Sequence, residues 1–559
     1  MAESITSRLR GNTAASTTTS GPGALSRWHY VVALALGALN TLSFAPTPHG
    51  GWLEIGIFTL LYAWLTRTTG WKSAALTGGA FGFGNLVTGV WWLYVSMHHY
   101  GEMPAPLAIA ALVLFSLYLA LYPAFSAGLW SFCAGHANHG AREDRPFSPT
   151  WHGAFAFASA WALGEWLRGT VFTGFPWLAS GYAQVDGPLA GFAAIGGVYG
   201  VGWMLALTCA LIVQSLSAWF SAARRRAAIV LPALAAIVVM GSGAALTHVA
   251  WTLPGNAPLT VRLLQGNVKQ EMKFDEDGVR AALDLYERMI TSHAADLIVT
   301  PETAIPMLPQ QFPETFGSAL RRFVDDTGSS LLIGAFGASI GPDGRYTDET
   351  NSFFGVTPGS RQLYRYDKHH LVPFGEFVPW GFHWFVQLMN IPLGDLARGK
   401  PVQHPFMVHN QPVDVDICYE DIFGEEIART LREAPVPAGI LVNASNLAWF
   451  GDTIALDQHL QMARMRTLET GRPMLAATNT GATAIIDARG RVSARLQAFT
   501  AGQIEATVQG MTGRTPYITV GNNLVLAVSL VLIALGFAYG PGRVRSGRVR
   551  SGRVTSEHK

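Results

Sequence analysis

Three residues whose side chains could carry out covalent chemistry each stand just past an apolar, strand-like stretch: Glu302, Lys368 and Cys418. A cysteine thiol has a reference pKa of about 8.5, so little of it is thiolate at neutral pH, and a carboxylate base such as Glu302 would help it to attack. When a thiolate adds to a carbonyl group, negative charge develops on the oxygen, and a fixed cation such as Lys368 stabilises it. The three residue types therefore indicate a single site with a cysteine nucleophile, a base and an oxyanion-stabilising cation.

The elements that must position these side chains lie in the segment 259–516, where short apolar runs alternate with helical stretches. Helices are expected at Val279–His293 and Thr453–Thr470. Strands are expected at Val261–Leu264, Leu297–Thr300, Ser330–Ala335, Phe353–Val356, Val413–Ile417, Ile440–Asn443, Met474–Thr478 and Thr483–Ile486. This pattern predicts an α/β domain with two sheets sandwiched between helices. Functional groups in open α/β sheets gather beyond the carboxyl ends of the strands, which is where the three residues fall.

The rest of the chain is too apolar for a soluble protein. Charged residues make up only 14% of the 559 residues of the whole chain, against about 25% in a typical soluble protein. Apolar runs of membrane length are expected to span at Tyr30–Ala45, Leu53–Leu65, Ala74–Met97, Leu107–Phe132, Gly153–Leu167, Leu189–Phe220, Ala227–Val249 and Val520–Tyr539. The second run is short enough to be an interfacial segment instead. We expect a multi-pass α-helical membrane domain with eight transmembrane helices.

The distribution of basic residues gives these spans an orientation. Arginine or lysine precedes the first span and follows the second, fourth, sixth and last, whereas the loops Pro46–Trp52 and His98–Pro106 contain neither. Because cytoplasmic loops carry the excess of Lys and Arg, both termini are expected in the cytoplasm and the polar segment in the periplasm, at the inner membrane. The expected organisation is a disordered cytoplasmic N-terminus (1–27), a seven-helix transmembrane domain (28–250), a catalytic domain (259–516), an eighth transmembrane helix (520–539) and a basic cytoplasmic tail (540–559).

Two features of the membrane part leave more than one interpretation open. Glu165 is followed one turn later by Arg168, near the outer end of the fifth expected span and just before Gly174-Phe175-Pro176-Trp177. Intramembrane charges are costly and mark sites by default, but an i,i+3 pair could also simply orient the helix at the interface. The glycine-rich run 196–202 in the sixth span permits either close helix packing or a break that lines a cavity.

Composition also argues against several function classes. The formal net charge is +2, and no basic patch with interleaved aromatic residues appears in the polar segment, so we expect no nucleic-acid partner. Cys133 and Cys209 lie in or at the edge of apolar spans and are interpreted as packing residues. Adjacent histidines on an extended chain point apart, so the pairs at 98–99 and 369–370 do not indicate a metal site.

At Glu302, Lys368 and Cys418 the sequence resembles the nitrilase superfamily, which uses Glu, Lys and Cys in this chain order. It more closely resembles the apolipoprotein N-acyltransferase family of bacteria with an outer membrane. The resemblance covers nearly the whole chain, and its motifs are Gln265-Gly266-Asn267, Pro301-Glu302-Thr303-Ala304, Lys368 with His370-Leu371-Val372-Pro373-Phe374-Gly375-Glu376, Ile417-Cys418-Tyr419-Glu420, Ala448-Trp449-Phe450-Gly451 and His459–Arg464. It implies a nitrilase-like α-β-β-α sandwich, with Glu302 as base, Lys368 as oxyanion stabiliser and Cys418 as nucleophile. Glu376, Tyr419 and Glu420 would support them. The chain departs from the family pattern at Leu447, where Asp is common, and at Phe274, where Trp is usual.

The resemblance implies a two-step acyl transfer without a cofactor. Cys418 would attack the acyl ester of a phospholipid, leaving a thioester, and the α-amino group of a diacylglyceryl-cysteine apolipoprotein would then take the acyl chain. An α-amine has a pKa of roughly 7.7 to 8, so a usable neutral fraction exists at neutral pH, whereas a lysine side chain stays protonated. A membrane-tethered amidase would use the same three residues on a small amide, and a non-enzymatic membrane scaffold would not need Cys418.

An aromatic segment between Lys368 and Cys418 holds Phe377, Trp380, Phe382 and Trp384. Aromatic side chains at a membrane interface anchor surface segments, so this segment is either a lid that admits a lipid chain or a helix packed on the domain core. The partners expected are the bilayer, a phospholipid donor and the apolipoprotein acceptor, with the protein itself a monomer.

Overall fold

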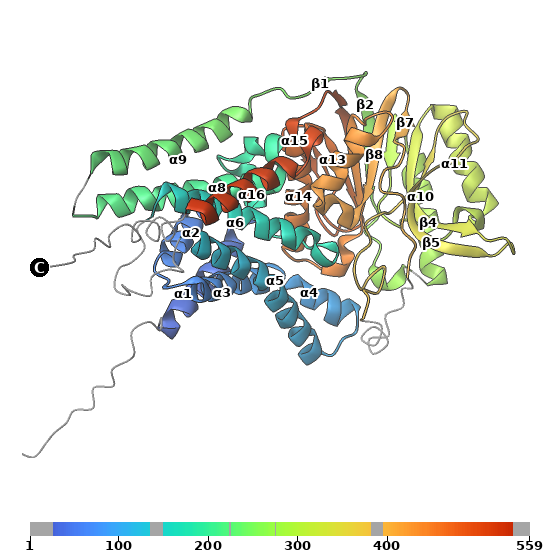
Figure 1. Ribbon diagram of the computed structural model, residues 1–559. Coiled ribbons are helices and arrows are strands. Elements are labelled where there is room, and N and C mark those ends of the chain that lie inside the picture. Colours follow the sequence, from blue (N-terminus) through green and yellow to red (C-terminus); the bar gives the residue numbers. More distant parts are fainter. Residues whose placement is uncertain (1–25, 135–148, 223–224, 274, 382–394, 540–559) are drawn as a thin grey trace, which may run out of the picture.

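The computed structural model describes residues 26–134, 149–222, 225–273, 275–381 and 395–539. Its helical half and its α/β half lie end to end in an elongated molecule (Figure 1). The expected N-terminal and C-terminal cytoplasmic segments lie almost wholly outside the described residues. Phe274, Phe382 and Trp384 also lie outside them.

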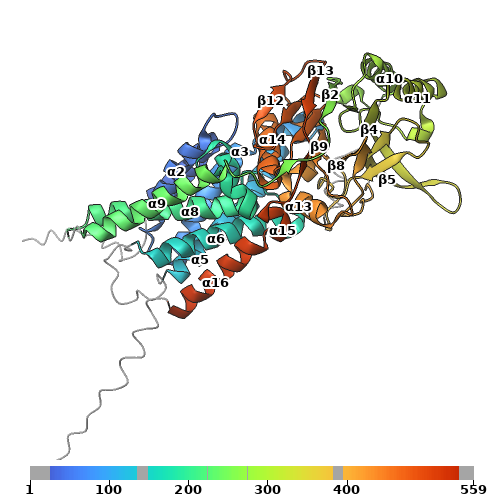
Figure 2. The ribbon, with the colours of Figure 1, turned by 90° about the horizontal axis from the view of Figure 1, so that it is seen from above.

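The helical half contains a helix at each of the eight expected spans: α1 (Arg27–Asn40), α2 (Gly50–Leu65), α3 (Trp71–Gly89), α5 (Ala105–Cys133), α6 (Trp151–Thr170), α8 (Ala193–Trp219), α9 (Arg226–Leu246) and α16 (Asn523–Tyr539). Within the described residues, three helices are long and apolar enough to cross a bilayer, namely Ala105–Cys133, Ala190–Trp219 and Arg226–Leu246. Two apolar helices, Gly50–Leu65 and Asn523–Ala538, are shorter. The count of eight spans is therefore not confirmed. The late helix α16 packs against α6, which brings the end of the chain back to the bundle (Figure 2).

The third expected span ends earlier than Met97. Helix α3 stops at Gly89, and the chain continues as a single turn, α4 (Trp92–Val95), and a π-helical turn, η2 (Ser96–Tyr100). The reason lies in the α/β half, where Gln458 donates to the Gly89 carbonyl (3.2 Å) and accepts from the Trp92 indole (3.2 Å). These contacts satisfy a helix-end carbonyl that would otherwise lack a partner.

The glycine run of the sixth span forms a break. Gly197 has φ 64° and ψ −169° inside α8, and a Cβ at this position would lie 2.4 Å from the Tyr517 ring. Only glycine fits there without strain. The amide of Val198, freed by the break, donates to Glu469 Oε1 (2.8 Å), so the α/β half holds this helix at its interruption.

The α/β half contains two six-stranded sheets. The first has the order β13-β2-β3-β4-β5-β6, with bounds β2 (Leu259–Gln265), β3 (Leu297–Val299), β4 (Ser330–Ile340), β5 (Tyr346–Val356), β6 (Tyr364–Asp367) and β13 (Gly502–Val508). The second has the order β12-β11-β10-β9-β8-β7, with bounds β7 (Phe406–Val408), β8 (Gln411–Ile417), β9 (Ile440–Ser445), β10 (Met474–Thr478), β11 (Ala484–Ile486) and β12 (Val492–Arg495). A short pair, β1 (Leu253–Pro254) and β14 (Met511–Thr512), closes the domain.

The two sheets face each other across an apolar core and are covered by helices on their outer faces. Residues such as Leu263, Val299, Val415 and Val442 fill the space between the sheets. Helices α10 (Glu276–Thr291) and α11 (Glu314–Thr327) cover the first sheet, whereas α13 (Gly424–Glu433), α14 (Ala455–Thr470) and α15 (Pro516–Val520) cover the second. The expected α-β-β-α sandwich is confirmed.

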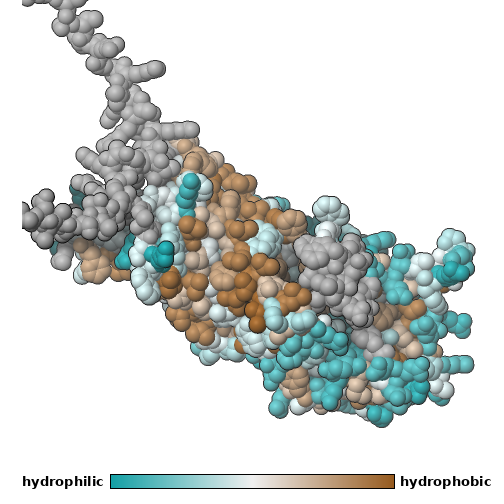
Figure 3. Space-filling view, turned by 90° about the horizontal axis from the view of Figure 1, so that it is seen from below, coloured by the Kyte–Doolittle hydropathy of each residue, from teal (hydrophilic) through white to brown (hydrophobic). Residues whose placement is uncertain are grey.

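The surface changes character between the halves. In Figure 3 hydrophobic residues gather over the helical half, and hydrophilic residues cover the α/β half. Helix α14 packs on α8 at the junction, where Arg466 and Glu469 form an ion pair (2.9 Å) with both side chains fully buried. The α/β domain is thus docked on the end of the helical bundle.

Candidate active site

The ends of three strands bring the three central side chains to one edge of the sandwich. Strand β3 runs parallel to β4, β5 runs antiparallel to β4, and β6 runs antiparallel to β5, so β3 and β6 point the same way. Glu302 and Lys368 follow β3 and β6, and Cys418 follows β8 in the facing sheet. The geometry agrees with the sequence-based expectation that functional groups gather at the carboxyl ends of strands.

Lys368 lies at the centre of a buried hydrogen-bonded cluster with Glu302, Glu376 and Asn351. Its Nζ is 2.9 Å from Glu376 Oε1 and 3.3 Å from Glu302 Oε1. Asn351 Nδ2 donates to both carboxylates, at 2.7 Å and 2.8 Å. The amide of Asn446 donates to the other oxygen of Glu302 (2.7 Å). All the groups of this cluster, called the Lys368 cluster below, are buried, and the opposite charges are paired, as buried charges must be.

Charge pairing decides the protonation of the cluster. Burial by itself would raise the pKa of the Glu302 carboxyl, but Lys368, Lys273 and two hydrogen-bond donors outweigh it and hold the pKa below its usual value. Burial by itself would lower the pKa of Lys368, but the carboxylates of Glu376 and Glu302 raise it above its usual value. Glu302 is therefore an ionised base and Lys368 a permanent cation at neutral pH.

The Cys418 thiol stays protonated in this environment. Burial raises its pKa well above the usual value, the nearby charge of Glu302 raises it further, and Lys368 opposes both only in part. A thiol that is protonated at rest needs a base to attack, and an ionised Glu302 can provide one.

The backbone at Cys418 is strained and held from both sides. Cys418 has φ 54° and begins the short turn η9 (Cys418–Ile422). Its carbonyl accepts from Asn443 Nδ2 (3.2 Å) and from His459 Nε2 (3.3 Å). Burial lowers the pKa of His459 to about 4, so the ring is neutral and its proton lies on Nε2. A non-glycine residue that keeps a left-handed backbone conformation because its surroundings fix it is typical of a functional site.

The three residues expected to support the centre each have a defined contact. Glu376 Oε2 accepts from the Val372 amide (2.8 Å), which closes the loop after β6. Glu420 accepts from the amides of Ile417 (2.7 Å), His369 (2.7 Å) and His370 (3.1 Å), and from the Tyr366 hydroxyl (3.0 Å). It therefore ties the segment after Lys368 to the segment before Cys418. The Tyr419 hydroxyl donates to the Gly174 carbonyl in the helical half (3.0 Å).

Sequence reasoning missed a second buried ammonium group at the site. Lys273 Nζ donates to the Glu302 carbonyl (3.2 Å), and the side chain is 5% exposed. Burial lowers its pKa to about 8, although the charges of Glu302 and Cys418 oppose this. The sequence signal that could have indicated Lys273 is its position next to Phe274, where the family pattern usually has Trp. The donors Asn351, Asn443, Asn446 and His459 were also missed as functional groups, although Asn446 and His459 stand within recognised motifs.

The aromatic segment is described only in part. Trp380 is 96% exposed, and the Arg398 guanidinium lies 4.7 Å from the centre of the half-buried Phe377 ring. Leu447, which departs from the family pattern, is buried in the turn η10 (Leu447–Phe450). No three His, Cys, Asp or Glu side chains in the described ranges are grouped as metal ligands, and the expectation of a site without metal stays a prediction.

Comparison with known proteins shows the family of this chain. The family models for the apolipoprotein N-acyltransferase N-terminal domain and for carbon-nitrogen hydrolase match residues 36–211 and 234–517. An apolipoprotein N-acyltransferase of Ralstonia nicotianae is 50% identical over 517 residues, covering 92% of this chain and 94% of the relative. One from Nitrosomonas europaea is 42% identical over 518 residues, covering 92% and 98%. A solved amidase from Nesterenkonia sp. has a TM-score of 0.34 at 16% identity and covers 46% of this chain and 93% of its own. From the family models and the relatives, this chain belongs to the apolipoprotein N-acyltransferase family.

Proposed function

We propose that this acyltransferase moves an acyl chain from a membrane phospholipid to the N-terminal amine of a diacylglyceryl-cysteine apolipoprotein, through a thioester on Cys418. The observation that carries the proposal is the buried cluster of Glu302, Lys368 and Glu376 beside a protonated cysteine. It supplies a base, a fixed cation and a nucleophile in one place.

In the first half-reaction Glu302 takes the thiol proton as Sγ of Cys418 attacks the ester carbonyl carbon. The negative charge on the carbonyl oxygen is stabilised by Lys368. The carbon–oxygen bond then breaks, and the departing lysophospholipid alkoxide receives the proton from Glu302. The products are an acyl thioester and a lysophospholipid, with Glu302 ionised again.

In the second half-reaction the α-amine attacks the thioester carbon, and Glu302 takes a proton from the nitrogen. The carbon–sulfur bond breaks, the Cys418 thiolate regains the proton from Glu302, and the amide product leaves. Burial of the site limits competing hydrolysis of the thioester, which distinguishes a transferase from a hydrolase.

We assign Glu376 and Asn351 the role of holding the side chains of Lys368 and Glu302 in place. Lys273 holds the main chain of Glu302 by donating to the Glu302 carbonyl. Glu420 aligns the segments that carry Lys368 and Cys418, and Tyr419 connects the nucleophile to the helical half. No step in this scheme requires a cofactor or a metal ion.

We also propose an arrangement in the membrane. Eight spans with both termini in the cytoplasm place the α/β domain, 259–516, on the periplasmic side of the inner membrane. The positive-inside pattern and a helix at each of the eight expected spans support this arrangement. The exposed Trp380 supports the hypothesis of a lid at the bilayer surface. A monomer is sufficient for the chemistry, because one chain supplies the base, the cation and the nucleophile.

The decisive experiment incubates the full-length protein with phospholipid carrying a labelled acyl chain, followed by intact-mass measurement of the wild type and Cys418→Ser. We expect a labelled adduct on the wild type alone, released when a diacylglyceryl-cysteine peptide is added. Adducts on neither protein would reject the thioester. Ammonia release from a small amide, independent of phospholipid, would favour the amidase alternative.

A further inference from the structure

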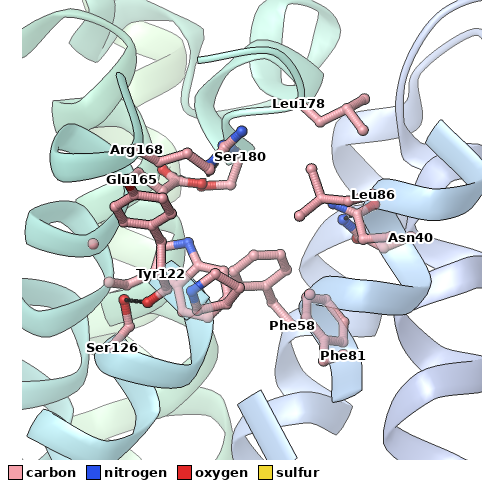
Figure 4. A pocket seen from close by; sticks show the side chains of 15 residues that line it. Asn40, Phe58, Phe81, Leu86, Tyr122, Ser126, Glu165, Arg168, Leu178 and Ser180 are labelled. Atoms are coloured by element: carbon pink, nitrogen blue, oxygen red, sulfur yellow. Dashed lines mark hydrogen bonds between the residues drawn. The ribbon is translucent and has the colours of Figure 1, made fainter. Parts of the chain in front are cut away.

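Glu165 and Arg168, the two charged residues of α6 that the reaction scheme leaves unused, both bind the same loop. Among the contacts of the described residues they have separate partners and do not form the i,i+3 ion pair that their spacing suggested. Glu165 accepts from the Ser180 amide (2.7 Å) and hydroxyl (3.0 Å). Arg168 donates to the carbonyls of Phe175 (3.0 Å) and Trp177 (2.5 Å). Figure 4 shows Glu165, Arg168 and Ser180 side by side.

The start of this loop has an unfavourable backbone conformation. Phe172, Thr173 and Gly174 have φ values of 52°, 74° and 85° in succession, and Leu178 has φ 59°. A Cβ at Gly174 would lie 2.0 Å from the Gly169 carbonyl oxygen. Strain of this kind persists only where surrounding contacts fix the conformation, and it is concentrated at functional sites. The buried Glu165 and Arg168 provide such contacts.

The loop touches the active-site turn from two directions. The Gly174 carbonyl accepts the hydroxyl of Tyr419, the residue that follows Cys418 (3.0 Å). The Trp177 indole donates to Gln458 (2.7 Å), and its ring lies 6.2 Å from the ring of His459, centre to centre. His459 in turn donates to the Cys418 carbonyl. The loop therefore contacts both Tyr419, which follows Cys418 in the chain, and His459, which binds the Cys418 carbonyl.

A ligand-binding role for the two charges fits the structure less well. The cavity beside them, whose lining includes Asn40, Tyr122 and Ser126 as well as Glu165 and Arg168, has a volume of about 30 Å³. This is the space open to the centres of water-sized spheres, so the cavity admits a few water molecules at most and is too small for an acyl chain or a lipid headgroup.

We propose that Arg168 and Glu165 are positioning residues for the acyl transfer. They clamp the loop 174–180 within the helical bundle, so that the Gly174 carbonyl and the Trp177 ring hold the Tyr419 and His459 sides of the Cys418 turn. The inference rests on Cys418 being the nucleophile. It gives the helical half a part in the chemical step, beyond anchoring the domain in the membrane.

A double-mutant cycle on the full-length protein tests the connection. The variants are Arg168→Gln, Tyr419→Phe and the double variant, and the readouts are kcat and KM for acyl transfer from vesicle phospholipid to a diacylglyceryl-cysteine peptide. We expect each single change to lower kcat about ten-fold and to leave KM within about two-fold, because neither side chain is assigned to substrate binding. If both act through the Tyr419–Gly174 contact, the double variant will be no slower than the slower single variant, within about two-fold.

A double variant whose loss equals the product of the two single losses would overturn the inference, and so would an effect on KM alone. Should Arg168→Gln fail to fold, Arg168→Lys and Ser180→Ala repeat the cycle with smaller changes. A further variant, Glu165→Gln, weakens the other side of the clamp and should also lower kcat. Glu54→Gln is its control, because Glu54 is likewise a buried carboxylate but accepts from Gln184 instead of the loop. Equal losses in these two variants would also reject the clamp. Adduct formation by Cys418→Ala, which has no nucleophilic atom at this position, would reject the nucleophile itself, so the two failures are distinguishable.

Discussion

Two buried charge clusters of the α/β domain are built from similar parts and yet have opposite protonation behaviour. The Lys368 cluster places Glu302 and Glu376 around Lys368, whereas the junction cluster places Asp421 and Glu469 near Arg466. Burial alone would raise the pKa of Glu302, but the charges of Lys368 and Lys273, with two hydrogen-bond donors, hold it below its usual value. In the junction cluster, burial raises the pKa of both Asp421 and Glu469 to about 7, in spite of Arg466.

The difference lies first in the charges and then in the hydrogen bonds. Two ammonium groups, Lys368 and Lys273, act on Glu302, whereas Asp421 and Glu469 share the guanidinium of Arg466 and have further carboxylates nearby. Glu302 accepts from Asn351, Lys368 and the Asn446 amide, and so both of its oxygens are occupied. Both carboxylate oxygens of Asp421 and Oε2 of Glu469 have no hydrogen-bond partner among the described residues. Donors stabilise the charged form of a buried acid, and unoccupied oxygens favour the protonated form. The Glu302 carboxylate is therefore ionised at neutral pH, as the proposed base must be, whereas the carboxyl groups of the junction cluster take up protons near neutral pH.

The largest effect is expected from Lys368→Met. It removes the cation assigned to the oxyanion and leaves Glu302 and Glu376 buried without their shared partner. We expect the rate of thioester formation to fall by about 10³-fold, at the upper end of what loss of an oxyanion-stabilising group costs. Single-turnover mass measurements with labelled phospholipid follow it, on protein whose thermal transition shows that it is folded. A loss below ten-fold would contradict the role of Lys368.

Lys273→Met tests how much the second ammonium contributes to keeping Glu302 ionised. Without that charge the pKa of Glu302 rises, so the acid limb of the kcat/KM profile should move to higher pH. We expect the largest loss of rate at acidic pH and a smaller loss at pH 7, because a higher pKa leaves less Glu302 carboxylate as the pH falls. The measurement is a pH–rate profile from pH 4 to 8.

The exposed Lys269, four residues earlier in the same segment, is the matched control. Lys269→Met should leave the profile unchanged, because its ammonium is solvated and screened. An acid limb that stays in place in Lys273→Met would show that Lys273 acts only on the local backbone.

Trp380→Ser concerns delivery of substrate and leaves both clusters intact. The ring is 96% exposed and, as a lid residue, would contact lipid. We expect a loss of about three- to five-fold with phospholipid in vesicles and little change with a short soluble ester, since interfacial aromatic side chains anchor at the bilayer surface. An equal loss with both substrates would count against a lid.

How far the sequence predicts this molecule depends on whether a contact is local. Each of the three central residues follows a strand, so the rule about strand ends was enough to bring Glu302, Lys368 and Cys418 together. The extended stretch before Lys368 was expected and is β6, whereas strands β1, β7, β12, β13 and β14 were not predicted, because they are short or carry polar side chains on a half-exposed face, as in Val492-Ser493-Ala494-Arg495. Lys273 and His459 were missed because a lone Lys or His becomes functional only through distant partners. The break of α3 at Gly89 likewise depends on Gln458, far along the chain.

Glu469→Gln has the smallest expected effect, and it tests the direction in which the junction cluster makes stability depend on pH. The folded-state pKa of Glu469, about 7, lies above its usual value, so between about pH 4.5 and 7 the folded protein keeps a proton that the unfolded chain has lost. This contribution to the unfolding free energy is therefore largest at low pH and is lost as pH rises to 7, by on the order of 1 kcal/mol per pH unit. Glu302 has a lowered pKa and contributes with the opposite sign, losing stability only below about pH 4.5.

Glutamine still accepts from the Val198 amide but does not titrate, so unfolding midpoints of Glu469→Gln should depend less on pH between 5 and 7 than those of the wild type. The exposed Glu276→Gln should show the wild-type slope, and a wild-type slope in Glu469→Gln would mean that the junction cluster does not bind protons on folding.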